Sequence, residues 1–364
     1  MRKYYTRACN FSYGLEARDL IKKKLALPLC GNKNIAFKQI EILSRVTKSK
    51  IIDIKNISKL SKSIKIIILK DVKKIVCKRQ NLNRYLNFKE PLIMGVLNLT
   101  PDSFSDGGLF NKEKRALSHI KSMIDKGANI IDVGGESTRP GSKDVHPNNE
   151  WSRIKKIIIN FKNKFPKIFL SVDTRKSEVM ERALSNKTDL INDVSGFNYD
   201  KSAVDKIKNH NVWKVLHHMQ GTPNTMQINP KYKNVLLDIY DFFEKKLKTD
   251  FKKFKNKKFI IDPGIGFGKK LKHNLILMNK ISLFHSLGFP ILIGTSRKRF
   301  INQISGSFDS KERIGGTLAS VLYTLMQGVQ IFRVHNVNEV KQGILVFKKI
   351  VSYWWVKNIL EQME

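Results

Sequence analysis

The chain has 364 residues, with 68 Lys and Arg against 31 Asp and Glu, and a formal net charge of +37. Its length suits one large barrel with an appendage better than a single domain of usual size. The charge alone would suggest a nucleic-acid or anionic-membrane partner. However, most basic residues are Lys and they are spread along the whole chain, so we expect a solvated surface and neither of those partners.

Cysteine usage and the N-terminus indicate the compartment. Cys9, Cys30 and Cys77 are an odd number at wide spacings without a CxxC pair, so neither a disulfide framework nor a zinc site is expected. The first eleven residues lack the apolar core of a signal peptide, and apolar runs such as 66–69 are far too short to span a bilayer. These features predict a soluble, cytoplasmic protein.

Residues 1–90 differ from the rest of the chain. They are rich in Lys, Ile, Asn and Ser, poor in Gly, and hold no catalytic-looking cluster. The segments 51–57 and 64–75 contain enough β-branched residues to be strands. We therefore predict a small folded N-terminal α+β extension over residues 1–90, of unknown role, in place of a disordered tail.

From Pro91 onward, short apolar runs end in polar or glycine-rich residues and are followed by stretches of helical periodicity. Eight runs occur, at residues 93–98, 129–134, 168–173, 189–194, 212–217, 258–263, 290–295 and 329–334. Strands that are apolar throughout and alternate with helices indicate a parallel sheet. Eight such units predict an α/β fold, a (β/α)8 TIM barrel over residues 91–364, more than an open doubly wound sheet.

Polar residues follow nearly every run. They are Asn98, residues 134–141, Asp173, Asn192, His218 with Met219, Asp262, residues 296–298, and Arg333 with His335. One such residue alone is more often a helix cap or a satisfied structural group. Together they should converge on the barrel mouth, where TIM-barrel chemistry takes place, and they are too many to be caps.

The chemical types of these residues indicate a ligand with two unlike ends. The carboxylates of Asp173 and Asp262 suit a flat heterocycle with several N–H donors, whereas Arg and His suit a diphosphate. Arg333 and His335 are two residues apart on a strand, so both can face one anion. His217 and His218 are adjacent and face opposite sides of a strand, so no zinc site is assigned.

Three loops add to this picture. Residues 98–108 form a polar, glycine-containing loop able to close over a substrate, and residues 134–141 offer Thr138 and Arg139 to a diphosphate. The glycine-rich stretch 262–269 fails the P-loop spacing, because Lys270 occupies the position of the required Ser or Thr. There we expect Asp262 to act and Phe267 to form an apolar wall.

The motifs GVLNLTPDSFSDGG (95–108), DVGGESTRPG (132–141), SVDTRK (171–176), INDVSG (191–196), HMQGTPNTMQ (218–227), IDPGIGFGK (261–269), GTSRK (294–298) and RVHNV (333–337) occur in this order. Together they resemble dihydropteroate synthase, from about Pro91 to the C-terminal helices. The resemblance implies condensation of 6-hydroxymethyl-7,8-dihydropterin diphosphate with p-aminobenzoate, with Mg²⁺ as cofactor, usually in a homodimer that sulfonamides inhibit. It covers roughly three quarters of the chain.

The resemblance also implies roles for individual residues. The pterin would be held or lined by Asp173, Asn192, Met219, Asp262, Phe267, Gly294, Lys298 and Arg333. The diphosphate would meet Asn98, Thr138, Arg139, Arg333 and His335, with Asn98 also at the Mg²⁺. The aminobenzoate would meet Phe104, Pro140 and Arg299, and catalysis would fall to Asp106, Arg139, Lys298, Arg333 and His335.

Two departures and two alternatives remain open from the sequence. Arg299 stands where many family members have Ser, and Asn336 where they usually have Asp. The nearest alternative function is a pterin-binding methyltransferase barrel that acts with a corrinoid protein. A non-catalytic barrel that binds nucleic acid is a second, motivated only by the charge of +37.

Overall fold

The computed structural model describes residues 3–100, 109–138, 141–252, 254 and 256–360. Its larger part is a sheet of eight parallel strands in the order β10-β9-β8-β7-β6-β5-β12-β11. Their bounds are β5 (Leu92–Asn98), β6 (Ile130–Gly134), β7 (Phe169–Asp173), β8 (Leu190–Asp193), β9 (Trp213–His217), β10 (Phe259–Asp262), β11 (Leu292–Ile293) and β12 (Ile331–Val334). A parallel bridge between Ile261 and Ile291 joins the two ends of the sheet. The predicted TIM barrel is confirmed, and each strand lies within a predicted run or begins one residue before it.

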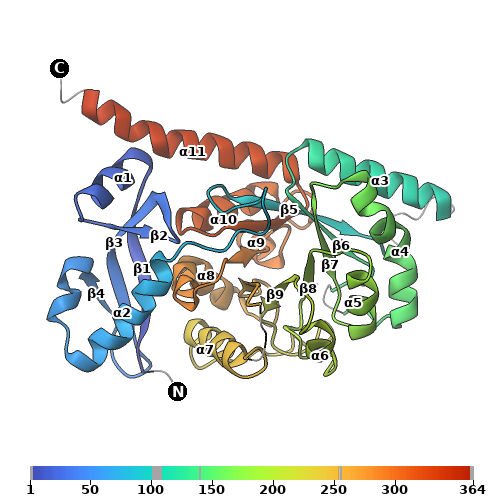
Figure 1. Ribbon diagram of the computed structural model, residues 1–364, viewed down its shortest axis with the longest axis horizontal. Helices are drawn as coiled ribbons and strands as arrows, with labels where there is room; N and C mark the ends of the chain where they lie inside the picture. Colours follow the sequence, from blue (N-terminus) through green and yellow to red (C-terminus); the bar gives the residue numbers. More distant parts are fainter. Residues whose placement is uncertain (1–2, 101–108, 139–140, 253, 255, 361–364) are drawn as a thin grey trace.

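Helices follow the strands and cover the outside of the barrel (Figure 1). They are α3 (Leu109–Asp125), α4 (Pro147–Lys164), α5 (Ser177–Leu184), α6 (Ala203–Ile207), α7 (Val235–Lys248), α8 (Leu271–Asn279), the 3-10 helix η3 (Ile281–Leu287), α9 (Arg299–Ser305), α10 (Ile314–Met326) and α11 (Val337–Leu360). Within the described residues, no helix is both long and apolar enough to cross a membrane.

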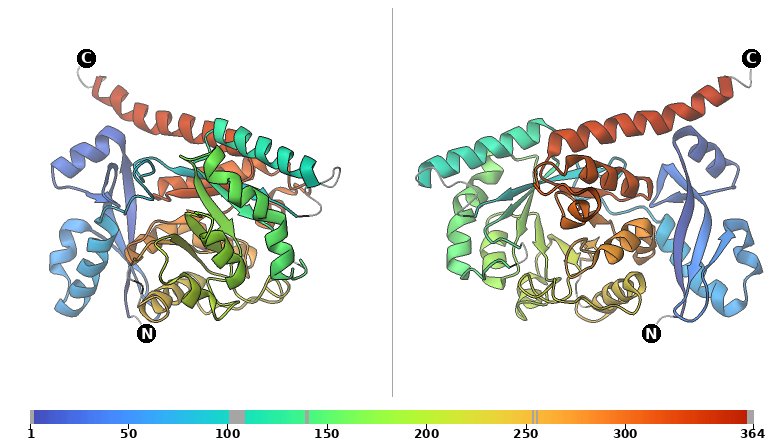
Figure 2. Two further views of the ribbon diagram at one scale, coloured as in Figure 1. Left: turned by 45° about the vertical axis from the view of Figure 1, so that its right-hand side comes forward. Right: turned by 180° about the vertical axis from the view of Figure 1, so that it is seen from behind.

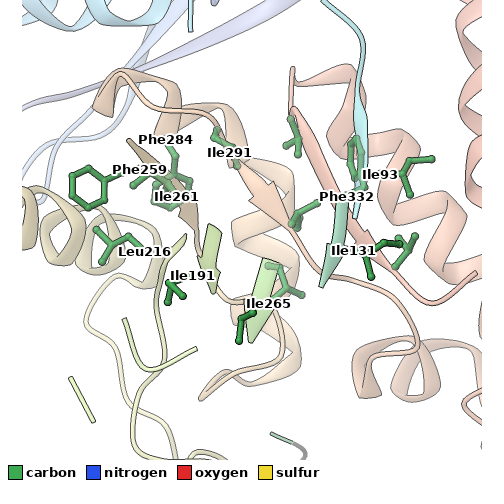
Figure 3. Packing of buried hydrophobic residues seen from close by; sticks show 14 of the residues in the cluster. Ile93, Ile131, Ile191, Leu216, Phe259, Ile261, Ile265, Phe284, Ile291 and Phe332 are labelled. Carbon is green, nitrogen blue, oxygen red and sulfur yellow. The ribbon is translucent and has the colours of Figure 1, made fainter. Parts of the chain in front are cut away.

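Alternate residues of each strand face two separate cores. Side chains such as Ile131, Ile191, Leu216 and Phe332 point outward and pack against the helices in the main cluster, seen in Figure 3. The inward positions of the lower barrel are apolar too: Leu92, Met94, Ile130, Phe169, Leu190, Trp213, Val215, Ile260, Leu292 and Ile331 fill the interior. Both faces are therefore buried, which explains why the strands read as continuous apolar runs.

The N-terminal extension is a separate antiparallel sheet with helices, as expected. It consists of β1 (Tyr5–Tyr13), α1 (Gly14–Lys22), β2 (Leu27–Leu29), β3 (Asn32–Leu43), β4 (Lys50–Asp53), the 3-10 helix η1 (Ile54–Lys59) and α2 (Lys62–Val76). Strand β3 pairs with β1, β2 and β4. Figures 1 and 2 show it beside the barrel, with α11 reaching from the barrel to α1.

The expectation of a strand over residues 64–75 was wrong, because this segment lies in helix α2. Ile68, Val72 and Ile75 recur three and four residues apart and are buried against the sheet of the extension. This helical spacing of the buried positions outweighs the β preference of the Ile residues. The strand expected within residues 51–57 is partly correct, since β4 ends at Asp53 and η1 follows.

Ion pairs and aromatic packing hold the extension on the barrel. Arg45 donates through Nη1 to Asp238 (2.6 Å) and through Nη2 to Asp241 (2.7 Å), both on α7. Tyr5 is completely buried in the main cluster, where its ring meets Tyr240 edge-on at 5.3 Å between centroids. The extension therefore shares a core with the barrel, and we expect the two to unfold together.

Replacing Arg45 with Met should lower the free energy of unfolding by about 1–2 kcal/mol, because it leaves two half-buried carboxylates on α7 without their cation. Lys121→Met is the matched control. It breaks an exposed pair with Asp125 on α3 and should cost less than about 0.5 kcal/mol. Urea denaturation followed by circular dichroism measures both. Two separate transitions in the Arg45 variant would contradict a shared core.

Candidate active site at the barrel mouth

The polar residues of the mouth continue the inward positions of the strands. Every second residue of a strand faces the barrel interior. Starting from the apolar interior residues of each strand, this alternation places Asn98 on β5, Asp173 on β7 and Asn192 on β8 on the inner face. Asn98 pairs in register with Gly134, Gly134 with Asp173, and Asp173 with Asn192. The structure thus brings these predicted residues together on one rung of the barrel.

Arg333 on β12 connects two acidic residues across the barrel. Its Nε donates to Asp132 Oδ2 (2.6 Å) and its Nη2 donates to Asp173 Oδ2 (2.7 Å). Asp132 also accepts from Ser171 Oγ (2.5 Å) and from Asn192 Nδ2 (3.0 Å). Burial raises the pKa of Asp173, as do the carboxylates of Asp132, Glu150 and Asp193, against the opposing effect of Arg333. The Arg333 guanidinium is therefore fixed in place before any ligand arrives.

Asp132 and Ser171 were not among the residues predicted from the sequence. Both lie inside apolar runs and not at their ends, and both are completely buried. The alternation of side chains along a strand could have identified them. Asp132 is two residues beyond inward-facing Ile130, and Ser171 is two residues beyond inward-facing Phe169. A carboxylate at an inward position must find a partner.

Asp262 lies at the end of β10, where the next loop turns back across it. Its Oδ1 accepts from the backbone N–H of Gly264 at 2.8 Å. Burial raises the pKa of Asp262 to about 6, against the Gly264 N–H and the Lys298 and Lys269 ammonium groups, which lower it. Oδ1 is thus partly satisfied by the backbone, and Oδ2 lies 3.9 Å from His217 Nε2.

Gly264 should tolerate no side chain. Its φ is +70°, and an added Cβ would lie 2.0 Å from the His218 carbonyl oxygen. Gly264→Ala should destabilise the protein by about 2–4 kcal/mol through strain and overpacking. Gly306→Ala is the control, because its φ is +76° with nothing within 4 Å of the added Cβ. It should cost about 1 kcal/mol. Equal losses in thermal unfolding would show that the close approach is unimportant.

An apolar wall faces the charged groups. The Lys298 ammonium lies 3.9 Å from the centroid of the Phe267 ring, and burial together with Arg333 lowers the pKa of Lys298 to about 8. Met219 packs on a small cluster of Val194, Met226 and Phe267. Gly294 leaves room beside Arg333, since an added Cβ would stand 3.8 Å from the Arg333 Cβ. Together these groups can form a flat slot with one cationic edge.

The structure describes only some of the residues predicted to bind the diphosphate and the aminobenzoate. His335 meets Ser296 Oγ through its backbone N–H (3.3 Å) and Nδ1 (3.1 Å). Thr138 is half-buried at the end of the described part of its loop, and Arg299 is exposed at the start of α9. Phe104, Asp106, Arg139 and Pro140 lie outside the described residues. Among the described residues, no group of three His, Cys, Asp or Glu could hold a metal.

A buried ionic cluster fixes the loop that carries Thr138. Lys176 Nζ donates to Glu136 (2.7 Å) and to Glu150 (2.9 Å), and Arg175 Nε donates to Glu136 at 2.9 Å. Glu136 also accepts from the backbone N–H of Val145, which closes the loop. The sequence did not predict this cluster, because its members come from three separate segments of the chain and no local pattern pairs them. The cluster gives residues 136–138 a rigid base.

A cavity of about 450 Å³ lies elsewhere, between the extension and α10 and α11. Its walls include Pro91 and Gln330, which immediately precede β5 and β12, so it opens near the amino ends of these strands. It contains none of the predicted site residues. The mouth, where the convergent polar groups lie, is therefore the candidate active site.

Known proteins share both the sequence and the fold. The family model described as "Pterin binding enzyme" matches residues 94–335. Dihydropteroate synthase of Neisseria meningitidis is 38% identical over 272 residues, covering 73% of this chain and 94% of the relative. A Yersinia pestis dihydropteroate synthase in complex with a sulfonamide drug superposes with a TM-score of 0.68 at 36% identity, covering 73% of this chain and 96% of that one.

A second solved structure, the dihydropteroate synthase of Clostridium difficile determined in the presence of pteroic acid, has a TM-score of 0.67 at 37% identity. It covers 72% of this chain and 97% of the other. The matched part includes the strands that carry Asp132, Asp173, Asp262 and Arg333. The chain therefore belongs to the dihydropteroate synthase family of pterin-binding enzymes and is a transferase of folate biosynthesis.

Proposed function

We propose that the chain condenses 6-hydroxymethyl-7,8-dihydropterin diphosphate with p-aminobenzoate to 7,8-dihydropteroate and diphosphate. The observation that carries the proposal is that the mouth combines buried acceptors with cations. Asp173, Asn192 and Asp262 are buried there, Lys298 lies over the Phe267 ring, and Arg333 is paired with Asp173. A pterin diphosphate has N–H donors on its ring and an anion on its side chain, so it matches both kinds of group.

Several predicted residues are proposed to hold the pterin ring. The carboxylates of Asp173 and Asp262 accept from ring and exocyclic N–H groups, and Asn192 contributes an amide. Phe267, Met219 and Gly294 form the slot, with Lys298 and Arg333 at its edge. Support comes from the packing of Met219 on Phe267 and of Lys298 over the same ring.

The diphosphate is proposed to meet Arg333, His335, Thr138, Arg139 and Asn98. Asn98 offers a Mg²⁺ ion one amide oxygen, and no group of three His, Cys, Asp or Glu among the described residues could hold a metal. The ion would therefore have to share its ligands with the substrate. Mg²⁺ keeps several waters and takes phosphate oxygens readily, so Asn98 and the substrate could hold it together. When bound, the ion would neutralise charge that develops on the leaving diphosphate.

The proposed reaction needs no enzyme nucleophile. The bond between the pterin methylene carbon and the diphosphate oxygen breaks, and its electron pair leaves with the diphosphate. The amine of p-aminobenzoate then forms the new C–N bond and loses a proton to solvent. Arg333, His335 and Arg139 stabilise the leaving group, Lys298 positions the ring, and Asp106 stabilises the cationic carbon. Phe104, Pro140 and Arg299 border the aminobenzoate, where Arg299 can pair with its carboxylate.

We also propose a homodimer that works in the cytoplasm. Exposed apolar side chains lie on three neighbouring helices: Leu275 on α8, Tyr323 and Met326 on α10, and Leu345, Val346 and Ile350 on α11. Exposed apolar side chains on neighbouring helices suit a second copy of the chain. All three cysteines are free thiols, which suits a reducing compartment. Light scattering at several concentrations would give a mass of one chain if the dimer is wrong.

The two alternatives are less well supported. Relatives over 73% of the chain are named dihydropteroate synthase, which does not favour a corrinoid-dependent methyltransferase. A nucleic-acid-binding barrel would need no carboxylates in its mouth, whereas Asp132, Asp173 and Asp262 are buried there. Neither the proposed domain boundary at residue 90 nor the role of the extension changes this assignment.

The test is to incubate the purified chain with the pterin diphosphate, p-aminobenzoate and Mg²⁺, and to measure dihydropteroate by mass spectrometry and diphosphate by a coupled assay. Equal amounts of both products support the proposal, and sulfonamide should suppress them. A chain that binds the pterin but forms neither product would refute it. Tight, salt-sensitive binding to random DNA would favour the nucleic-acid alternative.

A further inference from the structure

His217 is a buried residue of the mouth that none of the assigned roles includes. It is the last residue of β9 and pairs in register with Asp262 on β10. Val215 and Trp213, two and four residues earlier, fill the barrel interior, so His217 continues the inward positions. Its neighbour His218 faces outward and packs edge-on against Phe242 of α7, at 4.9 Å between ring centroids. Only the first of the two histidines therefore belongs to the mouth.

The tautomer of His217 follows from its partners. Nδ1 lies 2.7 Å from the Val194 carbonyl oxygen, and a carbonyl can only accept, so Nδ1 carries the hydrogen. Burial lowers the pKa of His217 well below its usual value, and the Lys269, Lys298 and Arg333 cations lower it further, while the Val194 carbonyl opposes the shift. The ring is accordingly neutral, and Nε2 presents a lone pair.

That lone pair faces Asp262. Nε2 lies 3.9 Å from Asp262 Oδ2, which is too far for a direct hydrogen bond. When Asp262 is ionised, both atoms are acceptors and no hydrogen lies between them. An N–H donor placed there gains from both atoms in a three-centre arrangement. Phe267 meets the His217 ring edge-on at 4.6 Å between centroids, so the same wall that would line the pterin slot holds the imidazole in position.

We infer that His217 is a specificity-determining residue of this site: its Nε2 and Asp262 Oδ2 jointly accept the N–H hydrogens of the exocyclic amino group of the pterin. The inference rests on the proposed function and deepens it. The 2-amino-4-oxo edge of a pterin offers the ring N3–H and two amino hydrogens. Because Asp262 Oδ1 already accepts from the Gly264 N–H, Oδ2 is the less occupied oxygen of this carboxylate. His217 supplies the additional acceptor for the amino group.

The experiment is a protein-by-ligand cycle with two probes, 6-hydroxymethylpterin and its 2-deamino analogue, measured by calorimetry at pH 7.5. His217→Leu removes the acceptor with a side chain small enough for the space, and His217→Gln restores an amide oxygen near Nε2. We expect His217→Leu to lose roughly tenfold in affinity for the pterin and none for the 2-deamino analogue. His217→Gln should recover most of the preference.

Equal losses for both probes in His217→Leu would overturn the inference and leave His217 a packing residue. Unchanged pterin affinity would overturn it as well. If His217→Leu does not fold, as judged by circular dichroism, His217→Met takes its place with the same expected results. Wild-type turnover is measured in parallel, so that failure of the proposed function, seen as no product, is distinguished from failure of this inference, seen as product with an unchanged preference.

Discussion

Replacing Arg333 with Met is expected to cost about 3–5 kcal/mol of folding stability and to lower kcat/KM by a factor of about 100 or more. The guanidinium is the shared partner of two buried carboxylates, Asp132 at 2.6 Å and Asp173 at 2.7 Å. Without it, two buried carboxyl groups lie in the barrel interior without their shared cation. Urea denaturation gives the first effect, and dihydropteroate formation gives the second.

A double variant separates the two effects of Arg333. Adding Asp132→Asn to Arg333→Met removes one of the two carboxyl groups left without a cation and keeps the shape of the side chain, so most of the lost stability should return. Activity should not return, because the cation that we propose to bind the diphosphate is still missing. Arg182→Met is the control, since this exposed residue makes only surface contacts with Asn148 and Glu178. A double variant that regains activity would show that Arg333 is purely structural.

Much of the barrel was predictable, because burial on both faces gives each parallel strand its own apolar run. Polar residues at the strand ends then indicated the mouth, and Asp173, Asn192, Asp262 and Arg333 do converge there. The positions inside strands were harder to assign. Asp132 is enclosed by apolar neighbours in sequence, and only its inward parity shows that it faces the site.

Contacts between distant segments could not be predicted from the sequence. The cluster of Glu136, Glu150 and Lys176 joins residues up to forty positions apart, and no local pattern indicates that pairing. The strand prediction for the segment of helix α2 is wrong because it rests on the β preference of Ile. The spacing of the buried residues, three and four positions apart, is that of a helix. Two adjacent histidines on a strand only exclude a zinc site that uses both, whereas the alternation of side chains along β9 places His217 beside Asp262.

The affinity of the mouth for 6-hydroxymethylpterin should fall roughly tenfold between pH 7 and pH 5. Burial raises the pKa of Asp262 to about 6, so protonation below that value replaces an acceptor by an O–H that opposes the ligand's N–H donors. The folding stability of the free protein should change with pH in the opposite direction to the affinity. A carboxyl whose folded pKa is raised contributes stability that is present below the unfolded pKa and is lost as pH rises through about 6.

Asp262→Asn tests both halves of this argument. The variant should bind the pterin roughly 10–100 times more weakly at pH 7, because charged hydrogen bonds are lost, and its affinity should be flat between pH 5 and pH 7. Its free form should also lose the decrease in stability that the wild type shows over the same range. Asp250→Asn, which alters an exposed carboxylate paired with Lys246 on α7, is the control and should keep the wild-type profile. A pH dependence of affinity that persists in Asp262→Asn would show that another group titrates between pH 5 and pH 7, and would remove Asp262 from the proposed recognition of the amino group.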